Sequence, residues 1–60
     1  MNEVQKYKVE FPIGVFTTVR AQNFGGAFSA IVRQPVECIH EVNENEAIIN
    51  EGFSVTKLVS

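Results

Sequence analysis

One stretch of this chain has the apolar spacing of a helix, while the apolar residues on both sides of it alternate as in strands. The helical stripe repeats at i, i+3, i+4 and i+7 and consists of Phe24, Ala27, Phe28 and Ile31. Asn23 is a favoured N-cap residue, and Pro35 cannot continue a helix. The stretch therefore predicts one helix at 24–33. The alternative is a hairpin that turns at Gly25 and Gly26.

The flanking segments are rich in β-branched and aromatic residues and alternate between apolar and polar positions, which is typical of half-buried strands. They lie at 6–11, 15–21, 36–42 and 53–59. Residues 47–50 fit either a short strand or a helical turn. We therefore expect one small α+β domain over residues 1–60, in β-β-α-β-β order, with residues 1–5 frayed.

The expected packing lays the helix across one face of a small antiparallel sheet. The residues that should meet in the core are Phe24, Phe28 and Ile31 from the helix and Val9, Phe11, Val19 and Val55 from the strands.

A chain of 60 residues with a single cysteine cannot be held together by an internal disulfide. Domains of this length bury only about 60% of their unfolded surface, so good packing or association must supply the stability. The sequence contains no apolar run long enough to span a membrane. We expect a cytoplasmic protein, in the host cytoplasm if it is encoded by a phage.

The carboxylates gather in the second half of the chain. Residues 36–60 contain five glutamates and one lysine, whereas residues 1–35 contain four cations and two glutamates. Glu44 and Glu46 are therefore candidate contacts for a basic partner. The alternative is a solvated acidic loop that only keeps the protein soluble.

The inventory of catalytic and metal-binding residues is small. Cys38 and His40 would share one face of a strand, but so would Val36 and Val42, which favours a packing role for the pair. One Cys and one His cannot complete a four-ligand soft-metal site, and no phosphate-binding loop occurs. We expect a non-enzymatic chain without catalytic residues, metal or cofactor.

Nucleic-acid binding is a further hypothesis. Lys6, Lys8 and Arg20 would share the outward face of the first hairpin, with Phe16 nearby for base stacking. Three cations on an acidic chain argue against this function, because nucleic-acid-binding domains are usually basic.

The helix should present small residues on its outer face. Gly25 and Ser29 are four residues apart, as are Gly26 and Ala30. Such spacing lets another backbone approach closely, so Gly25, Gly26 and Ser29 are candidate contacts. The alternative is that glycines in a first turn cost little and have no role.

Two segments, "GFSVTKLVS" (52–60) and "TVRAQNFGGAFSAIVRQ" (18–34), resemble the small bacteriophage T7-type inhibitor of host bacterial RNA polymerase. The resemblance implies a strand–helix–strand domain that binds the polymerase through basic residues of its last strand. Lys57 matches the first of these basic residues, while Val59 stands at the second. The segment "VECIHEVNENE" (36–46) lengthens the connection between helix and last strand.

These observations together predict a small protein-interaction module, phage-encoded, that binds a host protein such as RNA polymerase. Lys57 and Arg20 on the sheet, or the acidic loop 41–51, would be the contacts. The alternative is a self-associating structural protein, a homodimer formed through the helix face or an edge strand.

Overall fold

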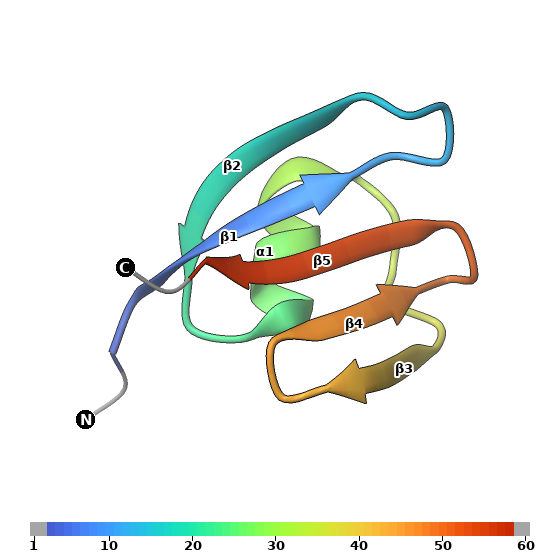
Figure 1. Cartoon of the computed structure of the whole chain (residues 1–60). Helices are drawn as coiled ribbons and strands as arrows, with labels where there is room; N and C mark the ends of the chain where they lie inside the picture. Colours follow the sequence, from blue (N-terminus) through green and yellow to red (C-terminus); the bar gives the residue numbers. More distant parts are fainter. Residues whose placement is uncertain (1–2, 59–60) are drawn as a thin grey trace.

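A computed structural model describes residues 3–58, which form one antiparallel sheet and one helix (Figure 1). The elements are β1 (Gln5–Glu10), β2 (Phe16–Ala21), α1 (Phe24–Ile31), β3 (Ile39–Asn43), β4 (Glu46–Ile49) and β5 (Phe53–Leu58). The strand order across the sheet is β2-β1-β5-β4-β3. This arrangement confirms the predicted α+β class and, with one additional strand, the predicted order. In the segment 47–50, which fitted two structures, residues 47–49 belong to β4 and Asn50 begins the next turn.

Five residues, 11–15, join β1 to β2, and three of them, 12–14, form the tight turn. The N–H of Phe11 donates to the carbonyl of Val15 at 2.7 Å, and the N–H of Gly14 donates to the carbonyl of Phe11 at 2.9 Å. Pro12 suits the first turn position, and Gly14 adopts a φ of 99°, which a residue with a Cβ rarely adopts. The loop therefore holds the β1–β2 register from Glu10↔Phe16 to Gln5↔Ala21 without a shift.

Helix α1 begins and ends close to where the sequence predicts. Asn23 is the N-cap, and its Oδ1 accepts the N–H of Gly26 at 2.6 Å. The helix stops at Ile31, because Val32 turns to extended backbone while its N–H still bonds to the carbonyl of Phe28. The alternative hairpin at the two glycines is therefore wrong. Among residues 3–58, no helix is long and apolar enough to cross a membrane.

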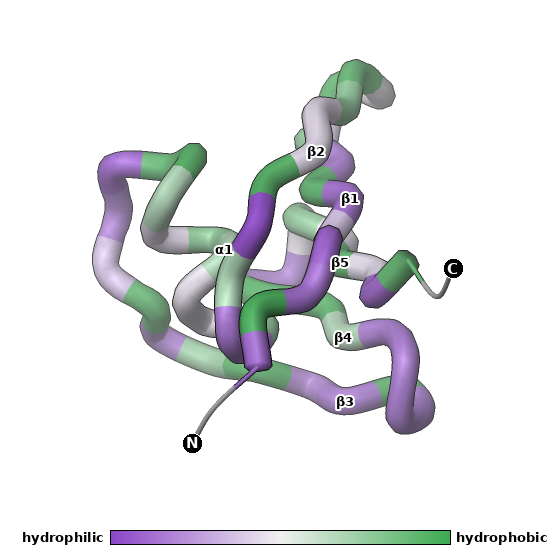
Figure 2. The backbone as a smooth tube through the Cα atoms, turned by 90° about the vertical axis from the view of Figure 1, so that its left-hand side faces the viewer, coloured by the Kyte–Doolittle hydropathy of each residue, from purple (hydrophilic) through white to green (hydrophobic). Residues whose placement is uncertain are grey.

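The core lies between α1 and the face of the sheet that the helix covers. In Figure 2, α1 and the segment after it lie on one side of the strands. The buried residues that form the core cluster are Tyr7, Val9, Ala27, Phe28, Val32, Ile49 and Val55, with Phe11, Val19, Phe24, Ile31 and Phe53 packed against them. Phe28 is fully buried and meets the ring of Phe53 edge-on at 5.0 Å. The predicted core residues are all part of this cluster.

Strand β3 begins at Ile39, three residues later than the alternation predicts, because the side chain of Asn50 binds the preceding backbone. Its Oδ1 accepts the N–H groups of Glu37 at 2.8 Å and Cys38 at 3.2 Å, and its Nδ2 donates to the carbonyl of Pro35 at 3.1 Å. These bonds hold residues 35–38 against the β4–β5 turn rather than in the sheet.

Candidate interaction surface

One face of the sheet carries no helix. In Figure 1 the helix lies behind the strands, so this face is turned toward the reader. Residues that pair across strands lie on the same face, and Lys6 pairs with both Arg20 and Leu58. Because side chains alternate along a strand, every second residue of each strand lies on this uncovered face. We call this surface the open face, and its residues are Lys6, Lys8, Glu10, Phe16, Thr18, Arg20, His40, Glu46, Ile48, Ser54, Thr56 and Leu58. None of these side chains is buried.

The half of the open face formed by β1 and β2 combines cations with an exposed aromatic ring. Lys6 pairs with Arg20 across the two strands, and Lys8 pairs with Thr18. The ammonium of Lys8 lies 5.2 Å from the centroid of the Phe16 ring, which is 62% exposed. This contact has cation–π geometry. The three cations therefore share the outward face of the first hairpin, as the sequence predicts, with Phe16 beside them.

Apolar side chains extend from this half of the sheet onto the β1–β2 loop. Ile13 is 83% exposed and Val15 is 55% exposed. The loop that carries them is fixed by two backbone hydrogen bonds, so the exposed side chains are held on a rigid turn. Together with Phe16 they form an apolar tip that is exposed on both sides of the hairpin, because Val15 lies opposite Phe11 on the helix side and Phe16 lies on the open face. Exposed apolar surface of this kind is typical of partner-binding sites. The sequence signal for this tip is the run "PIGVF", in which apolar residues surround a turn.

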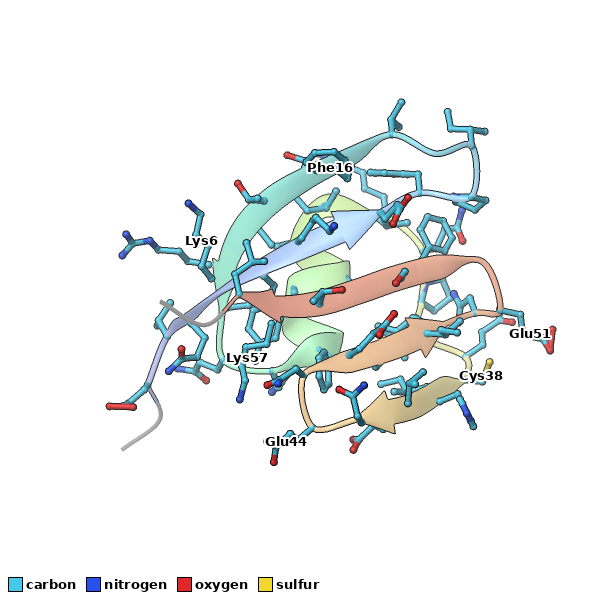
Figure 3. The ribbon with its side chains drawn as sticks, in the orientation of Figure 1. Lys6, Phe16, Cys38, Glu44, Glu51 and Lys57 are labelled. Carbon is cyan, nitrogen blue, oxygen red and sulfur yellow. The ribbon has the colours of Figure 1, made fainter. Side chains whose placement is uncertain are left out.

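Lys57 does not lie on the open face. It pairs with the buried Tyr7 in the β1–β5 register, which places it on the helix side of the sheet. Its backbone N–H bonds to the carbonyl of Asn45, and its side chain is half-buried. Arg20 lies on the opposite face, so the two cations do not form a joint contact surface. In Figure 3, Lys57 lies at the same end of the sheet as Lys6.

The glutamates of residues 37–51 do not form one patch. Figure 3 shows Glu44 and Glu51 at opposite ends of β4, in the turns before and after it. Glu46 lies on the open face and accepts the hydroxyl of Ser54 at 3.4 Å, whereas Glu41 faces the helix side through its pairing with the buried Ala47. The glutamates of this segment are therefore spread over both faces and both ends of the β3–β4 part of the sheet.

The outer face of α1 is only partly free. Gly26 and Ser29 are exposed, but Gly25 is half-buried, and a Cβ there would lie 3.8 Å from the Cδ1 of Ile39. A Cβ at Gly26 would lie 3.1 Å from the Oδ1 of Asn23, which is tighter than ordinary contact. The short N-cap bond therefore gives Gly26 a local structural role.

Cys38 and His40 lie on exposed backbone, which corrects the prediction that they pack against the core. Cys38 precedes β3 and its thiol is exposed, and His40 lies on the open face opposite Ile48. The prediction failed because residues 36–38 are not part of the strand, so the alternation of strand side chains does not extend to Cys38. Within residues 3–58, no group of three or more His, Cys, Asp or Glu side chains is placed to hold a metal ion.

Comparisons with known proteins give no relative for this chain: no protein family, no curated protein and no solved structure matches it.

Proposed function

We propose that this chain is a non-enzymatic domain that binds another protein through the open face of its sheet and the adjoining apolar tip. The observation that carries the proposal is the exposure of Phe16 beside the cations of β1 and β2, with Ile13 exposed on the adjoining hydrogen-bonded turn. Exposed aromatic and apolar side chains on rigid backbone supply most of the binding energy in protein interfaces. The neighbouring cations favour a partner with an acidic surface.

The resemblance to the phage inhibitor narrows the proposed partner to a host protein such as bacterial RNA polymerase, and the chain to a phage-encoded one. The resemblance implies a contact at Lys57, whereas the proposed open-face site implies a contact at Arg20. The two side chains lie on opposite faces of the sheet, so charge reversal at each position separates the two sites.

The test is capture of proteins from a bacterial lysate on the immobilised chain, followed by direct binding measurements with the retained protein and with purified RNA polymerase. We expect Arg20→Glu to weaken binding, and Lys57→Glu to leave it unchanged. Loss of binding on Lys57→Glu alone would move the contact to the helix side of the sheet. Absence of any specifically retained protein would contradict the proposal.

Single-stranded nucleic acid is a second candidate partner, because the Lys8–Phe16 pair lies between Lys6 and the hairpin tip on one face. Glu10 and Glu46 on the same face oppose phosphate binding, and one ring offers little stacking. Fluorescence anisotropy of labelled oligo-dT at low salt tests this candidate. Binding that Phe16→Ala abolishes would support it over a protein partner.

A further inference from the structure

The outer edge of β2 has neither the bulge nor the proline that usually prevents strand-to-strand association, and it carries a single charged residue, Arg20. Its six residues contain no proline or glycine, and its register against β1 has no bulge. The other edge strand, β3, has five residues and a register shift between Glu41 and Asn43. Natural proteins commonly block edge strands with bulges, charges or proline. The β3 edge is blocked by its bulge, whereas the β2 edge has only the charge of Arg20 against pairing.

The alternation of an antiparallel ladder identifies the backbone groups at this edge. In an antiparallel ladder every second residue pair exchanges hydrogen bonds. The N–H of Phe11 bonds to the carbonyl of Val15, and counting in steps of two from this pair makes Val9↔Thr17 and Tyr7↔Val19 hydrogen-bonded pairs as well. The residues between them therefore direct their N–H and C=O groups away from β1. These residues are Phe16, Thr18 and Arg20.

We propose that two copies of this chain pair antiparallel through their β2 edges, with a two-fold axis at Thr18, to form one continuous sheet. An isologous pairing must place outward-directed residues opposite one another. Centring the axis on Thr18 places Arg20 of each copy opposite Phe16 of the other, and it pairs the whole of β2. Centring it on Thr17 or Val19 leaves Arg20 or Phe16 without a partner inside the strand.

The side chains on the open face are complementary in this register. Arg20 of the second copy would lie over the ring of Phe16, which is 62% exposed in the single chain. Glu10 is the next residue across the sheet from Phe16, one strand spacing of about 4.8 Å further on. The second copy therefore contributes a cation to a site that already contains an aromatic ring, a carboxylate and the ammonium of Lys8, which lies 5.2 Å from the ring centroid.

The side chains on the helix side also match. Val15, which is 55% exposed, would lie opposite Ala21 of the second copy, and Thr17 would lie opposite Val19. These residues are small or apolar, and no two like charges lie opposite each other anywhere in the register. The pairing covers the ring of Phe16 but leaves the rest of both open faces uncovered, and it rests on the backbone groups of the β2 edge rather than on the proposed protein-binding function.

The β2 edge could instead pair with β3 of another copy or with a strand of a different protein, and the experiment described next distinguishes these cases. Pairing of β2 with β3 of another copy would be head-to-tail and would produce open polymers rather than dimers. A strand from a different protein would leave the isolated chain monomeric. The bulge in β3 disfavours the first, and the match of Arg20 to Phe16 favours a second copy over the other strand.

Sedimentation or light scattering of the full chain tests the pairing over a concentration series up to about 1 mM, because an interface of one strand pair is smaller than the standard of about 1,600 Å² and should be weak. We expect a monomer–dimer equilibrium. Thr18→Pro removes the central outward N–H without breaking a bond within the sheet, and should yield a monomer. Thr18→Val keeps that N–H and should dimerise like the wild type.

Disulfide trapping provides a second measurement that does not depend on the proline variant folding. In the Cys38→Ser background, Thr18→Cys places two thiols across the axis with Cα atoms about 5.5 Å apart, within the range of a disulfide. The matched control is Thr56→Cys on the same face, where the paired sheet would separate the two Cα atoms by about 24 Å.

We expect the Thr18→Cys variant to cross-link in a glutathione redox buffer at least about tenfold faster than the control, because the axis brings only its thiols within bonding range. The proposal would be overturned by a wild-type chain that stays monomeric throughout the series or grows into polymers, by a folded Thr18→Pro chain that dimerises like the wild type, or by equal cross-linking of the two cysteine variants.

Discussion

The side chain of Asn50 binds the backbone of residues 35–38, between α1 and β3, and its removal should destabilise the domain measurably. It makes three hydrogen bonds to the backbone of residues 35–38, and its own backbone has a φ of 53°. Bonds at an exposed site contribute about 0.5 kcal/mol each, at the low end of the usual range, so Asn50→Gly should cost about 1.5 kcal/mol. Asn50→Ala should cost about 1 kcal/mol more, because alanine disfavours positive φ.

Urea unfolding followed by circular dichroism measures both losses, and a domain of this size has only about 3–5 kcal/mol in total. Asn43→Ala is the matched control, since the side chain of Asn43 accepts one local bond from the N–H of Asn45. Hydrogen exchange at the amides of Glu37 and Cys38 should accelerate in the Asn50 variants alone. Equal losses for Asn50→Gly and Asn43→Ala, with unchanged exchange at those two amides, would refute the anchoring role.

Three further predictions concern the core, the helix cap and the thiol. Phe28→Ala should cost about 3–5 kcal/mol and leave the chain largely unfolded by circular dichroism, because the ring is fully buried; a cooperative native transition would contradict the described core. Gly26→Ala should lower the unfolding free energy despite the better helix propensity of alanine, because its Cβ would lie 3.1 Å from the capping oxygen of Asn23; a stabilised variant would show that the cap adjusts freely. Cys38 should react with a thiol reagent in native buffer as fast as in urea, because its side chain is exposed; a protected thiol would restore the packing role expected from sequence.

The elements that periodicity and turn residues determine locally could be predicted from the sequence. The helical stripe, the cap at Asn23 and the Pro12–Gly14 turn lie next to the residues they organise, so the helix and the first hairpin were recognised. The alternation of β1 and β2 also placed Lys6, Lys8 and Arg20 correctly on one face.

The rest depends on contacts between distant residues. The alternation of β5 places Lys57 on the same face as the buried Val55, so its helix-side position follows from the local pattern, but no local pattern encodes the insertion of β5 between β1 and β4. The start of β3 depends on Asn50, which binds backbone twelve to fifteen residues earlier. Without that contact, the alternation of residues 36–42 predicts a longer strand and a packed Cys38.

The central claim is that the open face, rather than the outer face of α1, carries the binding function. The most direct measurement compares the affinity of the captured partner for the wild type, Phe16→Ala and Ser29→Arg. Phe16 and Ser29 are both exposed, on opposite sides of the molecule, so neither change should unfold the domain. We predict that Phe16→Ala weakens binding by about 30-fold, the size of a hot-spot loss of about 2 kcal/mol, while Ser29→Arg has no effect. Loss of binding with Ser29→Arg and full affinity with Phe16→Ala would contradict the claim.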